Sequence, residues 1–498
     1  MDRDMKGSLN EAKQCKNEMG GNSSPPRLAP ARQSQKRQQK QASGAEEESK
    51  TVEGPVSAEL SKRIKQHAEH LKIRLPDRRW AAEMVNDFRD NLLKFLRLNS
   101  DPPFQSAEFL NSGSYFEKVK IHSPDEFDMM LKLQVGPRTI ATELDDGLFY
   151  QIHLTRPTQG PIRAFVLESE RTLSSSKILS EMYCLVRKFL KTYKVPDSDF
   201  LWMVNRKLPY SPAVTLSLSR KDARSDEWIS VDLVPALEVQ SWPVAVRSGP
   251  DVDKWLGKKV RQEMKSLPCF YVPKRLKGQN SEEAKESWRI SFSHIEKKLI
   301  RSHGNKKTCC ESNATKCCRK QCYMLLKSLI EGLKLRFPKE LDQLCSYHGK
   351  TVFLHTMCIR YDDAMWTPQQ LPACFLDLLS AMEGHARMGL LPHFFVPDCN
   401  MFSPASFSRK ALAFLVSALE EQRRKGLPLL SHPVPVPPII TMKPCGDTSY
   451  ESRKKASAIP ESSVRSICDP QEGILTTFLP LVVIALVVVL VLKFGLRV

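Results

Sequence analysis

Two apolar segments of this 498-residue chain carry acidic side chains where the core strands of a sheet are expected. In the first, Glu126 and Asp128 stand two positions apart and lead directly into the largely apolar run 129–133. Because side chains alternate along a strand, both carboxylates should point to the same face. The second segment, 228–237, holds Asp232 among apolar and β-branched residues. An unpaired buried carboxylate is costly, so Asp232 should be paired, protonated or bound to a metal.

Together these three carboxylates indicate a metal site for phosphoryl chemistry. Hard divalent cations prefer oxygen ligands, and two of them can activate an attacking hydroxyl and stabilise a pyrophosphate leaving group. Ser112, Gly113 and Ser114 lie just upstream, and a glycine lets the backbone approach a phosphate closely. We therefore expect a nucleotidyltransferase-type site on an α/β (α+β) scaffold. A turn followed by a surface strand, with Asp232 facing water, is the structural alternative.

Net charge and cysteine content indicate the class of partner and the cellular compartment of the protein. A net charge of +19 favours a polyanionic partner, either nucleic acid or an anionic membrane. The 14 cysteines are unevenly spread, and Cys309, Cys310, Cys317, Cys318 and Cys322 are packed together. This is not the pattern of a secreted disulfide framework, and the polar N-terminal residues do not form a signal peptide. We expect a reducing compartment, the cytosol or the nucleus.

Composition and periodicity divide the chain into five parts. Residues 1–56 are polar and basic with almost no aromatic side chain, so they should be disordered. We expect an α/β lobe over 57–245 and a mainly helical lobe over 246–428, with the active site in the cleft between them. Residues 429–472 are rich in proline and predict a stiff tether. The last part is an apolar tail over 473–493.

Hydrophobic periodicity predicts individual elements within the two lobes. Helical spacing over 60–74 and 79–98, interrupted at Pro76, predicts a broken spine helix packed behind the sheet. The other expected elements are strands at 164–167 and 213–218 and helices at 179–193, 288–301, 322–337, 368–385 and 406–424.

A second group of candidate ligands lies in the loop 303–317, between two predicted helices. His303, Cys309, Cys310 and Cys317 have the number and chemistry of a closed, tetrahedral structural Zn²⁺ site. Free thiols are the alternative, whereas a disulfide is disfavoured because vicinal cysteines rarely pair. Lysines and arginines surround the loop and would suit duplex phosphates, although a solvated charged face would have the same composition.

These residues, together with the segment 287–297, resemble the vertebrate cyclic GMP-AMP synthases, Mab-21 family nucleotidyltransferases that sense cytosolic double-stranded DNA. The resemblance covers about residues 57–425. It implies a bilobed nucleotidyltransferase fold with a mainly helical Mab-21 C-terminal lobe and a zinc loop insertion. It also implies an enzyme that is dormant until duplex DNA binds and that acts as a homodimer on DNA. The activity implied is synthesis of 2',3'-cGAMP, an innate immune second messenger, from ATP and GTP.

The resemblance implies roles for individual residues. Metal ligation is implied for Glu126, Asp128 and Asp232 (Mg²⁺ or Mn²⁺) and for His303, Cys309, Cys310 and Cys317 (Zn²⁺). An arginine fork suits base edges and a tyrosine ring suits base stacking. Nucleotide contacts are implied for Ser112, Gly113, Ser114, Lys274, Arg289, Ser291, Ser293, Glu296, Lys327, Ser346, Tyr347 and Lys350. DNA contacts are implied for Lys72, Arg74, Lys297, Lys307 and Lys320.

The C-terminal tail departs from this family. Residues 474–492 form a 19-residue apolar run, broken only by Thr476, Thr477 and Pro480. A helix of this length spans about 28 Å, enough for a bilayer. Because the run is apolar on every face, we expect a transmembrane tail anchor rather than a buried core helix. The folded lobes would then lie in the cytosol, and a nuclear location is also compatible with the sequence.

Two other functions fit the same sequence. A membrane-anchored Mab-21-like adaptor without catalysis would use only the basic surface, but such a relative is expected to lose at least one of Glu126, Asp128 and Asp232. A related synthase activated by double-stranded RNA would share the fold, since A-form RNA is recognised largely by its shape.

Overall fold

The computed structural model describes residues 56–431, apart from 136–137, 169–170, 209, 223–226, 247–251, 277–280 and 305–308. These residues all belong to one compact unit that begins at Val56. The predicted arm up to Pro55, most of the tether and the apolar run 474–492 lie outside the described residues. Within the described ranges, no helix is both long and apolar enough to cross a bilayer.

The described chain begins with two consecutive helices, α2 (Ala58–His70) and α3 (Leu75–Asn99). The Ser57 side chain accepts a hydrogen bond from the Leu60 amide and so caps α2. Pro76 lies in the first turn of α3, where a missing amide proton costs no helical hydrogen bond. The predicted break between two helices is confirmed, but it lies at residues 71–74, ahead of the proline. Helix α2 packs against α8 and α10 rather than behind the sheet.

One mixed sheet of nine strands forms the centre of the described fold. Its order is β1-β2-β7-β8-β9-β4-β3, and the pair β5 and β6 joins it through β7. Among these strands only β2 and β7 run parallel. The bounds are β1 (Glu108–Asn111), β2 (Glu126–Leu133), β3 (Thr139–Asp145), β4 (Phe149–Leu154), β5 (Phe200–Val204), β6 (Val214–Arg220), β7 (Glu227–Val239), β8 (Cys269–Pro273) and β9 (Trp288–Ser291).

The two faces of strands β2 and β7 pack against different surroundings. Met129 and Leu233 belong to the main core, which α4 (Ser175–Thr192) and α3 help to enclose. Met130 and Val234 point to the opposite face, because side chains alternate along a strand, and belong to a smaller apolar cluster. Asp128 and Asp232 share this second face, since each lies two positions before one of these residues.

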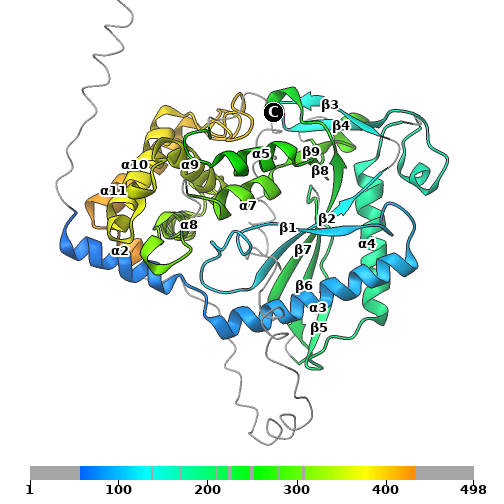
Figure 1. The fold of residues 1–498 in the computed structure, drawn as a ribbon, viewed down its shortest axis with the longest axis horizontal. Helices are drawn as coiled ribbons and strands as arrows, with labels where there is room; N and C mark the ends of the chain where they lie inside the picture. The colour runs from blue at the N-terminus through cyan, green and yellow to red at the C-terminus, as the bar shows by residue number, and fades with distance from the viewer. Residues whose placement is uncertain are drawn as a thin grey trace, which may run out of the picture. The chain divides into compact units, whose positions relative to one another are not determined.

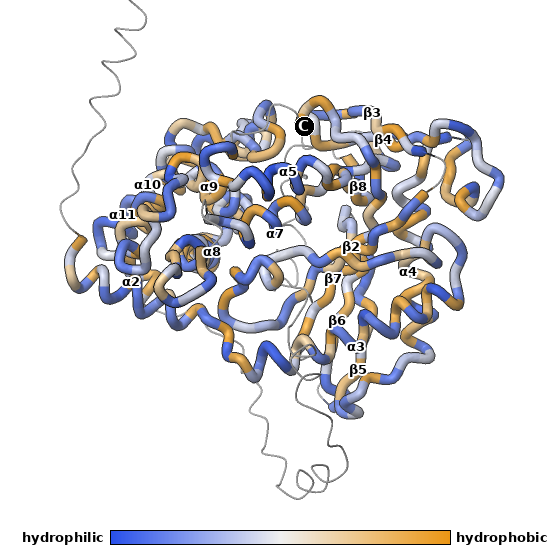
Figure 2. Tube along the Cα trace, in the orientation of Figure 1, coloured by the Kyte–Doolittle hydropathy of each residue, from blue (hydrophilic) through white to orange (hydrophobic). Residues whose placement is uncertain are grey.

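The rest of the described chain is mainly helical (Figure 1). Helix α10 packs against α2, α8, α9 and α11, so the N-terminal helix closes the C-terminal group. Figure 2 shows apolar strands at the centre and a strongly hydrophilic α5, which buries none of its residues. The bounds are α5 (Lys258–Ser266), α6 (Glu282–Lys285), α7 (Ser293–Arg301), α8 (Arg319–Arg336), α9 (Ser346–Ile359), α10 (Leu371–Met388) and α11 (Arg409–Arg424), and the 3-10 helices are Pro161–Phe165, Val244–Val246, Asn313–Thr315, Asp363–Trp366, Pro368–Gln370 and Pro428–Leu430.

Three predictions from the sequence are wrong in detail. The predicted helix 288–301 is strand β9 followed by α7, because Trp288 and Ile290 alternate into the core and β9 pairs with β8. The predicted strand 164–167 begins as a 3-10 helix that Pro161 starts. The boundary at residue 245 falls within the sheet-bearing part, since β8 and β9 return to the sheet beyond it. Strand pairing decides the first and third of these differences, and local periodicity does not report it.

Candidate active site

The parallel pairing of β2 with β7 brings the predicted acidic residues side by side. Asp128 and Asp232 are direct partners in the register, and Glu126 lies opposite Ser230 two pairs earlier. All three share the strand face of the smaller apolar cluster. Two chain segments that lie a hundred residues apart therefore present oxygen ligands to one place, which is the donor set that a hard divalent cation requires.

Glu126 lies deeper than the two aspartates. Its carboxylate is fully buried, accepts a hydrogen bond from the Lys120 ammonium, and leaves Oε1 without a hydrogen-bond partner among the described atoms. Burial raises its pKa well above the usual value, although Lys120 opposes the shift. An orphaned buried carboxylate oxygen beside two further carboxylates fits a site that binds a divalent metal ion.

Asp232 is held by a neighbouring strand. The Thr215 hydroxyl on β6 donates to its Oδ1 at 2.5 Å. Burial and the nearby charge of Asp128 raise the pKa of Asp232 to about 7. A cation would reverse this shift, because a positive charge favours the ionised carboxylate.

A pocket opens beside these strands and joins the sheet to the helical group. Gly113 contributes to it with φ of 85°, a conformation that glycine adopts at little cost. The lining residues are Gly113, Asp128, Leu148, Arg289, Ile290, Ser291, Phe292, Ser293, Glu296, Tyr347, Lys350 and His393. Eight of these twelve were predicted as metal or nucleotide contacts. The twelve residues come from six separate parts of the chain, so only the tertiary fold assembles them.

A buried ion network crosses the pocket. Lys350 on α9 donates to Glu296 on α7 and to Glu117, both at 2.8 Å, and the Tyr347 hydroxyl donates to Glu296 at 2.8 Å. Burial alone would raise the pKa of Glu296, but the Lys350 cation and these hydrogen bonds hold it below its usual value. Burial lowers the pKa of Arg289 to about 10, which keeps its guanidinium charged at neutral pH. The pocket thus offers fixed charges and an aromatic ring.

His393 is a pocket residue that the sequence reasoning missed. Its ring lies 5.9 Å from the Tyr347 ring at an interplanar angle of 20°, and its Nε2 lies 3.2 Å from the Tyr347 hydroxyl. Burial lowers its pKa to about 3, so the imidazole is neutral and offers one donor and one acceptor. No local motif surrounds His393, and its proximity to Tyr347 depends on a chain reversal after α10.

Several predicted nucleotide contacts lie outside the pocket lining. Ser112 and Ser114 are buried in the turn around Gly113. The Lys274 ammonium donates to the Tyr210 carbonyl oxygen, and Lys327 on α8 donates to the Val119 carbonyl oxygen at 3.4 Å. Ser346 begins α9 one residue before Tyr347.

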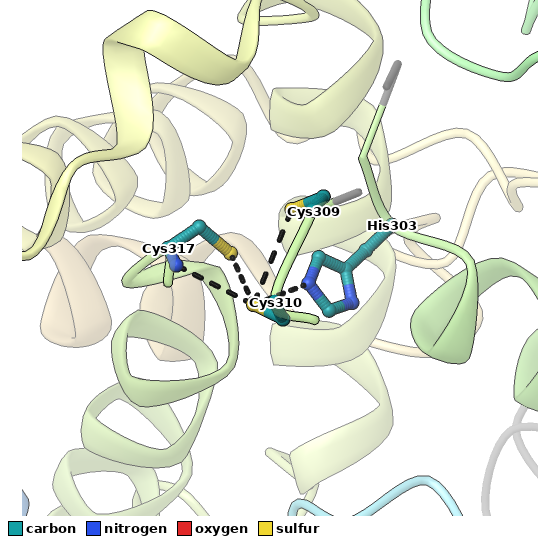
Figure 3. A group of neighbouring side chains, drawn as sticks. All are labelled: His303, Cys309, Cys310 and Cys317. Carbon is teal, nitrogen blue, oxygen red and sulfur yellow. Dashed lines mark hydrogen bonds between the residues drawn. The ribbon is translucent and has the colours of Figure 1, made fainter. Parts of the chain in front are cut away.

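The predicted zinc ligands converge on one point. One ligand atom from each of His303, Cys309, Cys310 and Cys317 lies within 4.8 Å of the others. Figure 3 shows the three sulfur atoms and the imidazole directed toward one another, with the Cys310 sulfur 3.4 Å from His303 Nε2 and 3.6 Å from the Cys317 sulfur. Hydrogen bonds with Cys309, Cys317 and His303 lower the pKa of Cys310. This donor set fits a tetrahedral Zn²⁺ site.

Neighbouring groups orient these ligands. His303 Nδ1 lies 2.8 Å from the Ile300 carbonyl oxygen, which turns Nε2 toward the thiols, as in many metal sites. The buried Arg319 guanidinium pairs with Asp363 at 2.9 Å and lies 3.7 Å from the Cys309 sulfur. The Ile300 carbonyl oxygen and the Arg319–Asp363 ion pair therefore hold His303 and Cys309 in position near the start of α8.

The predicted DNA contacts lie in the break between α2 and α3 and around the zinc group. Lys72 and Arg74 are exposed. Lys72 pairs with Glu69 at the end of α2, and Arg74 pairs with Asp77 in the first turn of α3. Lys297 on α7 lies over the Phe116 ring, and Lys320 is partly buried at the start of α8. Lys307 falls outside the described residues.

Comparison with known proteins agrees with this geometry. Residues 115–302 match the Mab-21 protein nucleotidyltransferase domain, and residues 318–421 match the Mab-21 protein HhH/H2TH-like domain. The chain is 39% identical to cyclic GMP-AMP synthase from Mus musculus over 368 residues, which cover 74% of this chain and 70% of the mouse protein. The chain belongs to the cyclic GMP-AMP synthase family. It is a Mab-21 nucleotidyltransferase.

Other relatives are similar over stretches of comparable length. Cyclic GMP-AMP synthase from Sus scrofa is 37% identical over 353 residues, covering 70% of this chain and 68% of the pig protein. A cyclic GMP-AMP synthase-like receptor from Magallana gigas is 27% identical over 344 residues, covering 69% of this chain and 53% of that receptor. The two matched domains contain every pocket-lining residue except Gly113, and the zinc-ligand residues lie in the stretch 303–317 between these domains.

Proposed function

We propose that this protein is a cyclic GMP-AMP synthase activated by double-stranded DNA, which makes 2',3'-cGAMP from ATP and GTP as an innate immune signal. The observation that carries the proposal is the register of β2 and β7, which sets Asp232 beside Asp128, a residue that lines the charged, aromatic pocket. An adaptor without catalysis would have no need of this arrangement. The kinship with mouse and pig cyclic GMP-AMP synthases supports the product assignment.

In this proposal the pocket binds and orients both nucleotides. Asp128, Asp232 and Glu126 would hold Mg²⁺ or Mn²⁺, which activates the attacking hydroxyl and stabilises the departing pyrophosphate. Tyr347 offers a face for base stacking, and Arg289 offers a fork for a base edge. Two successive transfers at one site would each form one phosphodiester bond and release one pyrophosphate.

Nucleic acid activation rests on the basic surfaces that flank the zinc-ligand group and the α2–α3 break. Lysine and arginine contacts to phosphates do not depend on base sequence, and their strength falls steeply with salt. Duplex RNA carries the same charges in a different helical shape, so it is the direct competitor as activator. We propose a cytosolic enzyme that works as a homodimer on DNA. The apolar tail, outside the described residues, would attach it to a membrane.

The decisive test is product formation by purified protein with ATP, GTP and Mg²⁺, with duplex DNA, duplex RNA or neither. We expect one product, identified by mass and by its 2'-5' and 3'-5' linkages. It should form in the reaction that contains duplex DNA and in neither of the other two. Asp128→Asn should reduce synthesis by at least about a thousandfold while labelled DNA binds equally well, because a metal ligand is lost and the basic surface is intact.

Glu108→Gln is the matched control for this test, since Glu108 lies on the neighbouring strand β1 but is exposed and pairs with Lys132. It should leave synthesis unchanged. Full synthesis by Asp128→Asn would refute the site, and activation by RNA rather than DNA would refute the proposed activator.

A further inference from the structure

The Glu126 carboxylate already has a cation beside it. The Lys120 ammonium pairs with Glu126 and also with Asp125 at 2.9 Å, and its side chain is only 9% exposed. Glu126 is fully buried and Lys120 is nearly so, and bulk water therefore screens this ion pair only weakly. Within the protein, Lys120 therefore neutralises the deepest of the proposed metal ligands.

The segment that carries Lys120 is held in an uncommon backbone conformation. Lys118 and His122 on either side have φ of 60° and 66°, the left-handed region that side chains with a Cβ rarely adopt. Such conformations persist where surrounding contacts enforce them. The position of Lys120 is therefore set by what holds its segment in place.

Two elements hold this segment, and both carry predicted nucleic acid contacts. The His122 amide donates to the Leu71 carbonyl oxygen at 3.3 Å, at the break between α2 and α3 where Lys72 and Arg74 lie. Helix α8 provides the second attachment, since Lys327 donates to the Val119 carbonyl oxygen. Helix α8 also begins two residues after the zinc-ligand residue Cys317.

We propose that Lys120 is an internal counter-ion that competes with the divalent metal ion for Glu126, and that the α2–α3 break and α8 hold it there in the resting enzyme. The inference rests on the proposed role of Glu126 as a metal ligand. A metal ion on the free Oε1 of Glu126 and the Lys120 ammonium on Oε2 repel each other strongly, so metal binding favours displacement of Lys120. Movement of either attachment by bound nucleic acid lowers the cost of that displacement.

The test measures Mn²⁺ affinity of the full chain without DNA, by calorimetry and by the metal-induced rise in melting temperature. Lys120→Met removes the competing charge and should tighten Mn²⁺ binding by about tenfold or more, because a buried, uncompensated Glu126 gains most from the metal. Lys120→Gln keeps a hydrogen-bond donor without the charge, packs more conservatively, and should behave in the same way. Addition of DNA should tighten Mn²⁺ binding in the wild type and change it little in either variant.

Lys132→Met is the matched control. Lys132 lies on β2 itself and also pairs with two carboxylates, Glu108 at 3.3 Å and Glu238 at 2.9 Å, but neither is a proposed metal ligand. Its loss should leave Mn²⁺ affinity unchanged. Adding Glu126→Gln to Lys120→Met should abolish the gain.

Two outcomes would overturn the inference: Mn²⁺ affinity in folded Lys120→Gln equal to that of the wild type, or a gain that persists without the Glu126 carboxylate. Failure of the proposed function is distinguishable. If the wild type makes cGAMP with DNA but the Lys120 variants bind Mn²⁺ no more tightly than the wild type, only the role of Lys120 is contradicted. If the wild type makes no product but the Lys120 variants bind Mn²⁺ more tightly than the wild type, only the proposed function is contradicted.

Discussion

At the scale of single residues, burial decides how the charged side chains behave. Burial raises the pKa of both Asp232 and Glu126, although the Lys120 cation opposes this shift at Glu126. His393 is kept neutral by the same physics beside the charged Lys350 and Glu296. Lys320 is the corresponding case on the proposed DNA surface, and it gives a prediction with a definite sign.

Burial, together with the charges of Lys118 and Arg301, lowers the pKa of Lys320 to about 8. The free protein should therefore lose this proton as pH rises through about 8, while a bound phosphate favours the protonated amine. We expect DNA affinity at constant salt to weaken between pH 7 and pH 9, measured by fluorescence anisotropy of a labelled duplex. The arginine of Lys320→Arg stays charged over this range, so the DNA affinity of this variant should change much less between pH 7 and pH 9. Identical pH profiles would exclude a contact by Lys320.

At the scale of elements, the N-terminus of α8 connects the zinc-ligand group to the helical core. Arg319 and Arg360 lie 5.3 and 5.4 Å from the Trp366 ring, and the Cys318 amide donates to the Trp366 carbonyl oxygen at 2.8 Å. The two arginines differ in burial. Arg319 is fully buried and pairs with Asp363, whereas Arg360 and its partner Asp377 are partly exposed.

Replacing these arginines in turn tests how the zinc group is supported. Arg319→Met should lower the free energy of unfolding in urea by about 3 kcal/mol, since it leaves Asp363 without its buried partner. It should also speed zinc loss to a chelator severalfold, because Arg319 contacts Cys309. Arg360→Met removes a more exposed pair at the same ring and should cost only about 1 kcal/mol. Equal effects of the two variants would contradict this account.

At the scale of the whole molecule, the fold brings sheet and helices together around one core. The main cluster of buried residues runs from α3 through the sheet to α10 and α11, and the pocket takes residues from both parts. A ligand in the pocket and a duplex on the basic surface would therefore act on one connected structure. The apolar run 474–492, outside the described residues, adds a prediction about location.

If that run anchors the protein, full-length protein should pellet with membranes and resist alkaline extraction, while truncation after Cys468 should release it. The exposed sequon Asn313-Ala-Thr315 reports the topology, because it lies between two proposed zinc ligands. We expect no glycan at Asn313, as judged by mass spectrometry of the membrane fraction. Release of full-length protein at high pH would exclude the anchor, and a glycan would exclude a cytosolic active site.

The sequence by itself determined the features that short-range chemistry can express. Alternation placed Glu126 and Asp128 on one strand face, helical spacing predicted α3 and α4, and ligand type and number picked out His303 with its three cysteines. Only the tertiary structure decided how distant segments meet. The pairing of β8 with β7, the approach of His393 to Tyr347 and the ion pair of Lys120 with Glu126 depend on register and packing. Local periodicity cannot predict these contacts, because they depend on how the whole core packs.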